Sequence, residues 1–119
     1  MAISEAYSGT EAVGTTEHSL TADAAYSGAT PITTDGVYQV FLDVSDMVAE
    51  DVLQIRIYEK CRSGDTQRVV YQAILGGVQA QPIWVSPSLV LMHGWDVTLD
   101  KLDGSGNTAT ILWSIRSVA

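Results

Sequence analysis

The chain contains the stretches Val37-Tyr38-Gln39-Val40-Phe41-Leu42-Asp43-Val44 and, shortly after, Leu53-Gln54-Ile55-Arg56-Ile57-Tyr58-Glu59-Lys60. β-Branched and aromatic residues dominate both stretches, and apolar side chains recur at every second position, which is the period of a β-strand with one buried face. Similar segments follow with turn signals between them, and no helical period is sustained. We therefore expect an all-β fold: a two-sheet antiparallel β-sandwich of jelly-roll or Greek-key type.

The first part of the chain differs in composition from the rest. Residues 1–34 are rich in Ser, Thr, Ala and Gly, and they contain no Lys or Arg. Their hydrophobic periodicity is weak, so we expect an extended N-terminal arm or a loosely paired edge segment there. Residues 35–119 are expected to form the β-sandwich core of a single domain, because 119 residues can bury such a core without metal or disulfide support.

Turn signals predict how the central strands pair. Ser63-Gly64-Asp65 predicts a hairpin between a strand from Val52 to Cys61 and a return strand from Thr66 to Leu75. Gly76-Gly77 is expected to break or bulge the return strand. Because Cys61 lies within a predicted strand, we expect it to be a small packing residue.

A second hairpin is predicted near the C-terminus. Trp95–Leu102 and Ile111–Arg116 both alternate, and the glycine-rich segment 103–107 lies between them. Trp95 and Trp113 are in register with aliphatic neighbours, so both are predicted to be core residues.

Aromatic residues at the predicted edges are the candidates for contact with a partner. Pro82 and Pro87 flank Ile83-Trp84-Val85, and since proline cannot donate to a ladder, this segment is predicted to be an edge strand. Trp84 is therefore a candidate for a subunit interface or a ligand platform. Tyr7 and Tyr26 in the N-terminal segment are further candidate interface residues.

The charge and hydropathy of the chain argue against several function classes. The net charge of −8 opposes binding to nucleic acid, whose phosphates require Lys and Arg. The longest apolar run, near residues 89–92, is too short to cross a membrane. The N-terminus lacks the basic and apolar regions of a secretory signal, so we expect synthesis in a cytosol-like compartment.

Residues that carry catalysis or bind metals are few. His18 is expected to be solvated on a mobile segment, and His93 is expected to be hydrogen-bonded at a turn. No Ser-His-Asp or Cys-His grouping follows from the spacing. Two distant histidines and one cysteine are too few ordinary ligands for zinc unless carboxylates or another subunit join. We therefore expect neither catalytic residues nor a cofactor or metal, and no enzyme.

A family resemblance adds to this interpretation. The order of motifs from residue 35 to the end resembles small virion proteins of tailed bacteriophages that decorate or cement the capsid. The motifs that carry the resemblance are Asp35–Gln39, Tyr58–Lys60, Ile83–Pro87, His93–Leu99 and Leu112–Arg116.

The resemblance implies a protein that joins an assembled shell late. Its partner would be the major capsid protein, and it would act as a homotrimer, or as a dimer, on the capsid surface of the virion after synthesis in the host cytoplasm. Binding to the lattice and not to free subunits would stabilise the shell. The N-terminal segment could grip a neighbour by adding a strand to its edge.

A carbohydrate-binding β-sandwich on a phage tail or host-recognition device is the alternative function. Its platform for a sugar ring would combine Trp84 with a tyrosine such as Tyr26.

Overall fold

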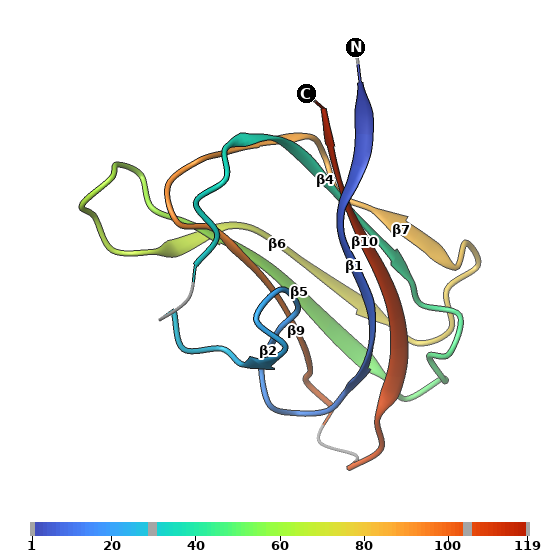
Figure 1. Ribbon diagram of the computed structural model, residues 1–119. Coiled ribbons are helices and arrows are strands. Elements are labelled where there is room, and N and C mark those ends of the chain that lie inside the picture. The colour runs from blue at the N-terminus through green and yellow to red at the C-terminus, as the bar shows by residue number, and fades with distance from the viewer. Residues whose placement is uncertain (1, 29–30, 104–105, 119) are drawn as a thin grey trace.

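The protein is a sandwich of two antiparallel β-sheets (Figure 1). The computed structural model describes residues 2–28, 31–103 and 106–118. Within these ranges, no helix is long and apolar enough to span a lipid bilayer. The strands are β1 (Ile3–Val13), β2 (His18–Ser19), β3 (Ala24–Ala25), β4 (Gly36–Asp43), β5 (Val52–Glu59), β6 (Arg68–Gly76), β7 (Ile83–Val85), β8 (Leu89–Leu91), β9 (Asp96–Lys101) and β10 (Ala109–Val118).

The two sheets divide the strands equally. Sheet A has the order β1-β10-β4-β7, and β8 also pairs with β4; sheet B has the order β3-β2-β9-β5-β6. This arrangement confirms the predicted all-β fold with two antiparallel layers, and the jelly-roll or Greek-key subtype stays a prediction. The first and last strands lie side by side, so both termini are at one end of the molecule (Figure 1).

The hydrophobic core lies between the sheets and is supplied by alternate residues of the central strands. Val40 and Leu42 of β4 face Ile55 and Ile57 of β5 across this core, and each is almost fully buried. Trp95, just before β9, is also fully buried, as predicted, and its indole N–H donates to the Thr34 carbonyl at 3.1 Å. The alternation of apolar residues in 37–44 and 53–60 therefore marks the side chains that pack the two sheets together.

The predicted hairpin in the middle of the chain is confirmed. β5 pairs with β6 antiparallel from Val52↔Gly76 to Glu59↔Arg68, with an irregularity beside Ile57 and Tyr58. β6 ends at Gly76, and Gly77 has a φ of 72°, a backbone conformation that favours glycine. The prediction for Cys61 is wrong: β5 ends at Glu59, and the thiol-bearing residue is exposed.

The second predicted hairpin is wrong, because β9 and β10 belong to different sheets. β9 pairs with β5 and β2 in sheet B, whereas β10 pairs with β1 and β4 in sheet A. Residues 102–108 thus connect the two layers; of the predicted turn, residues 104–105 lie outside the described residues. Alternation specifies which face of a strand is buried and does not specify its neighbour.

The N-terminal segment contributes to both sheets. β1 is an edge strand of sheet A and pairs with β10 from Ile3↔Val118 to Val13↔Ala109, with an irregularity between Glu5 and Tyr7. β2 and β3 form the edge of sheet B. The segment predicted as an arm or edge segment is therefore paired along much of its length.

Candidate functional site

The outer face of sheet A carries a row of apolar side chains that crosses four strands. The register places Ile3 of β1 opposite Val118 of β10, Val118 opposite Val37 of β4, and Val37 opposite Val90 of β8. Opposed residues in antiparallel strands point to the same face, so these four residues form one continuous row, called here the apolar row. Val90 is 73% exposed and Ile3 is 68% exposed.

Further apolar groups continue from the apolar row along the same face. Phe41 of β4 lies opposite Val85 of β7, and the Arg116 guanidinium lies 3.7 Å from the centre of the Phe41 ring. A hollow of about 190 Å³ lies between these groups and the apolar row, lined among others by Ile3, Phe41 and Arg116. Leu112 and Ile83 are also about half exposed. Among the described residues, no third layer covers this face.

The outer face of sheet B carries a polar network around Glu17, beside the exposed Val69 and Ile74 of β6. Glu17 accepts hydrogen bonds from the Tyr58 and Thr98 hydroxyls, each at 2.6 Å, and Arg56 lies 3.7 Å from the same carboxylate oxygen. Burial, and then the bond to Glu17, raise the pKa of Tyr58 to about 12. This network fixes the segment before β2 on β5 and β9.

Two further carboxylates lie on this face of sheet B. Burial raises the pKa of Asp96, while hydrogen bonds from Ser19, Val97 and Thr21 oppose the rise. Burial also raises the pKa of Asp100, and the nearby Glu17 charge raises it further. Asp96 Oδ1 accepts from the Ser19 hydroxyl at 2.7 Å and from the Val97 amide at 2.8 Å, so this oxygen is already used within the fold.

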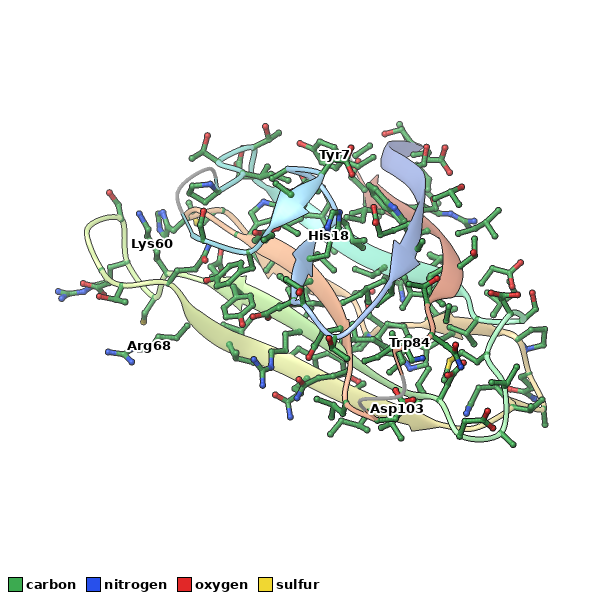
Figure 2. The ribbon with its side chains drawn as sticks, turned by 90° about the horizontal axis from the view of Figure 1, so that it is seen from below. Tyr7, His18, Lys60, Arg68, Trp84 and Asp103 are labelled. Carbon is green, nitrogen blue, oxygen red and sulfur yellow. The ribbon has the colours of Figure 1, made fainter. Side chains whose placement is uncertain are left out.

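The three predicted interface residues lie at separate places. Tyr7 packs against the core with its ring edge-to-face on Trp95, at a centroid distance of 6.0 Å. Tyr26 stacks on Tyr58 at 4.3 Å. Trp84 lies 6.4 Å from the Tyr71 ring and also packs against the core. Tyr7 and Trp84 are on strands at opposite edges of sheet A, and Figure 2 shows them well apart.

Sheet B separates the two aromatic rings proposed for a sugar platform. Tyr26 contacts Tyr58, which is on the outer face with Arg56, whereas Trp84 contacts Tyr71, which is opposite the core residue Ile57. The fold therefore does not bring Tyr26 and Trp84 onto one surface. Trp84 instead lines a groove with Gln79 and Gln81.

Two groups of residues that the sequence did not predict come together in the fold. The apolar row was not recognised because its members come from four strands and meet only through their register. The second group is Glu11, His18 and Asp23, whose side chains gather although His18 was expected to be solvated. Their spacing in the sequence matches no familiar metal-ligand motif. Only the pairing of β2 with β9 and the β2–β3 turn bring the three side chains together.

Comparisons with known proteins identify no relative from which a function could be transferred. No protein-family model matches the sequence, and no curated protein and no solved structure is significantly similar to it.

Proposed function

We propose that the chain is a structural virion protein that binds the outer surface of an assembled phage capsid and stabilises it. The observation that carries the proposal is the apolar row on the outer face of sheet A, in which Ile3, Val90 and Val118 are exposed and Val37 is half-buried between them. A contiguous exposed apolar surface of this kind is typical of a protein contact site. The partner would be the major capsid protein, which the motif resemblance implies.

The outer face of sheet A is better suited to this contact than the edges of that sheet. β1 already pairs with β10 on one side, carries Glu5 and Glu11, and has an irregular register between Glu5 and Tyr7. β7 is three residues long and is flanked by prolines. Charges, bulges, prolines and short strands all oppose the addition of another strand. Docking through the face therefore replaces the strand addition that was expected of an N-terminal arm.

The apolar row is surrounded by groups that can orient a partner. Arg116 and Glu5 lie opposite each other on this face, and Gln39 lies opposite Arg116. A polar rim around an apolar contact fixes the orientation of the bound partner. The net charge of −8 favours a protein surface with basic groups and disfavours nucleic acid.

The mechanism is thermodynamic linkage. A protein that binds the assembled lattice more tightly than free capsid subunits shifts the equilibrium towards the shell. In a homotrimer, or in a dimer, several weak contacts act together. Once one subunit has bound the shell, the next subunit is held at a high effective concentration near its own binding site. The stiff two-sheet body suits such a role because its contact face is formed by paired strands.

The test compares Val90→Asp with Val78→Asp. Val90 is 73% exposed in the apolar row, and Val78 is 70% exposed outside the strands of sheet A, so a carboxylate should be equally tolerated by the fold at both positions. We expect the parent and Val78→Asp to run as oligomers, to sediment with capsids depleted of this protein and to raise the capsid melting temperature. For Val90→Asp we expect a loss of affinity on the order of 30-fold, the effect of about 2 kcal/mol at an interface centre.

Two results would contradict the proposal. If the parent neither forms oligomers nor raises capsid stability, the function is wrong. If Val90→Asp binds capsids as the parent does, the apolar row is not the contact. Binding to a glycan array that is lost in Trp84→Ala, with capsid stability unaffected, would instead support the carbohydrate-binding alternative.

A further inference from the structure

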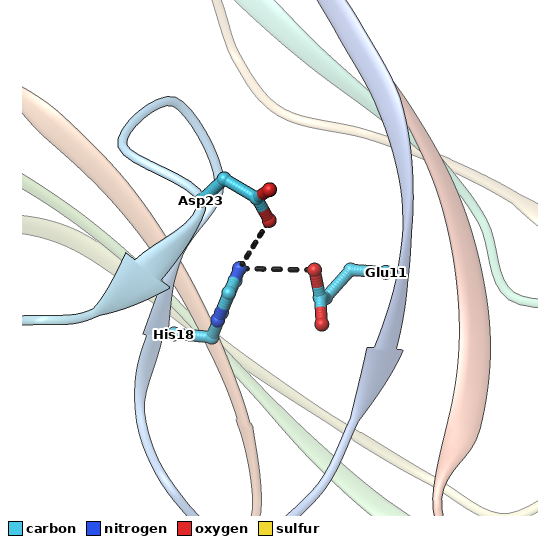
Figure 3. Close-up of side chains that lie close together, drawn as sticks. All are labelled: Glu11, His18 and Asp23. Atoms are coloured by element: carbon cyan, nitrogen blue, oxygen red, sulfur yellow. Dashed lines mark ion pairs between the residues drawn. The ribbon is translucent and has the colours of Figure 1, made fainter.

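We propose that Glu11, His18 and Asp23 form a binding site for a divalent transition-metal ion of the zinc class. Figure 3 shows that the two carboxylates approach the same imidazole nitrogen from different segments. The His18 Nε2 atom lies 3.0 Å from a Glu11 carboxylate oxygen and 3.3 Å from an Asp23 carboxylate oxygen. One ligand atom from each residue lies within 4.8 Å of the other two.

The fold brings these ligands together from both sheets. Glu11 is on β1 of sheet A, opposite the core residue Ile111, and therefore points between the layers. His18 is on β2 of sheet B, opposite the core residue Leu99, and points the same way. Asp23 is in the turn after β2, with a φ of 53°. The site thus lies at the open side of the sandwich, where the edge strand of sheet A meets the β2–β3 hairpin.

The spacing of the donor atoms agrees with coordination. Ligand atoms about 2.0 to 2.2 Å from a zinc ion are about 3 to 3.5 Å from each other when the angles at the metal are between right-angled and tetrahedral. Both separations from His18 Nε2 fall in this range. Nε2 itself is buried and makes no aligned hydrogen bond with either carboxylate. A buried nitrogen beside two acceptor oxygens has at most one proton to offer them, whereas a metal ion can bind all three atoms.

The donor set determines the class of ion. Imidazole nitrogen favours zinc and its neighbours in the transition series, and calcium and magnesium favour sites made of oxygen alone. The described ion pairs of Glu11 and Asp23 are with His18, and none is with Lys or Arg, so a dication would supply the positive charge that these carboxylates lack. Glu11 and Asp23 also line a groove of about 480 Å³, from which water could complete the coordination.

The bound ion would join the edge strand of sheet A to the edge of sheet B. It would link β1 to the β2–β3 hairpin and hence stabilise the N-terminal segment against opening. This role is independent of the proposed capsid contact, because Glu11 and His18 point between the layers and the apolar row points away from them.

The experiment is a zinc titration of chelator-treated full-length protein. Cys61 is exposed and could bind zinc by itself, so the parent for all measurements is Cys61→Ser. By calorimetry we expect one Zn²⁺ per chain, with a rise in melting temperature that Ca²⁺ and Mg²⁺ do not produce. His18→Gln should weaken zinc binding at least about 10-fold, the loss typical of disturbing an outer-shell partner alone. Glu11→Gln should weaken it in the same direction.

The matched control is His93→Gln, which removes the other histidine and should leave zinc affinity unchanged. Circular dichroism without metal verifies that each variant is folded. If His18→Gln does not fold, the zinc affinity of Glu11→Gln provides the test. Absence of any zinc-dependent rise in the melting temperature of the parent would overturn the site, and would mean that a proton holds His18 between its carboxylates. Equal zinc affinity in His18→Gln and the parent would also overturn it.

Discussion

Asp96 is a carboxylate that the fold buries on the outer side of sheet B, where residues are usually solvated. Its side chain accepts hydrogen bonds from Ser19, Thr21 and the Val97 amide, yet burial outweighs them and raises its pKa. The folded chain therefore binds this proton more tightly than the unfolded chain does. Ionisation of Asp96 lowers the free energy of unfolding at neutral pH, and this penalty disappears below the unfolded pKa of 3.8.

The substitution Asp96→Asn tests this sign. Asparagine keeps an oxygen acceptor for Ser19 and Val97 and removes the buried charge. We expect a higher melting temperature than that of the parent at pH 7, with the difference shrinking as the pH falls towards 4. Thermal denaturation monitored by circular dichroism across this range measures the effect. A difference that grows with acidification would mean that the charged carboxylate stabilises the fold.

At the scale of the elements, β9 is the strand whose surroundings differ most from its apparent pattern. All six of its residues are buried, including Thr98 and Asp100, although its sequence alternates as if one face were solvated. The inner face packs through Val97 and Leu99 into the core. The outer face is covered by Glu17 and by the residues that bind it. β10, by contrast, exposes Leu112 and buries Ile111.

This difference predicts unequal effects for two identical substitutions. Leu99→Ala removes a fully buried side chain from β9 and should lower the free energy of unfolding by about 2 to 5 kcal/mol. Leu112→Ala, on a strand of sheet A, removes a side chain that is 50% exposed and should lower it by less than about 1 kcal/mol. Urea denaturation of both variants compares them. Equal losses would show that β9 is not central to the core.

At the scale of the whole molecule, one end of the sandwich is closed by a buried ion pair. The Lys101 ammonium, on a side chain that is 1% exposed, lies 2.8 Å from Asp51 in the β4–β5 connection and 3.5 Å from Asp103 after β9. It also donates to the Asn107 carbonyl at 2.8 Å. Lys101 therefore joins two of the connections between strands. The hydrogen bond from Lys101 lowers the pKa of Asp51.

The substitution Lys101→Met should lower the melting temperature at pH 7, because it leaves Asp51 buried beside Asp103 without its cation. Asp51 has a lowered pKa, so its stabilising contribution is complete above the unfolded value of 3.8 and is lost as the pH falls through the folded value. The gap between variant and parent should hence narrow in acid.

The double variant Asp51→Asn with Lys101→Met should recover part of the loss at pH 7, because no unpaired charge is then left at this position. Lys60→Met is the control for loss of a lysine elsewhere. If that control lowers the melting temperature as much as Lys101→Met does, the effect is one of net charge and not of the buried pair.

Local signals predicted strands in the middle of the chain, but they did not predict the strand β1 (Ile3–Val13) in the N-terminal segment of weak periodicity. The alternating stretches predicted β4 and β5, Ser63-Gly64-Asp65 predicted the hairpin to β6, and the two prolines predicted that Ile83–Val85 is an edge strand. They did not predict that β9 and β10 separate into different sheets. A glycine-rich segment allows a tight turn and equally allows a crossing between layers, so pairing partners remained undetermined.

By itself, the sequence determined that this chain folds as two antiparallel layers and that the residues of β4, β5, β6 and β7 have strand character, because side-chain alternation and turn residues act over a few positions. The tertiary structure alone decided which strands are neighbours. Strand register then aligned Ile3, Val118, Val37 and Val90 on one face, and the meeting of β1 with β2 placed Glu11 beside His18. The apolar row unites residues far apart in the chain, and Glu11 and His18 lie on strands of different sheets, so both sites come from packing of the whole core, which no local pattern encodes.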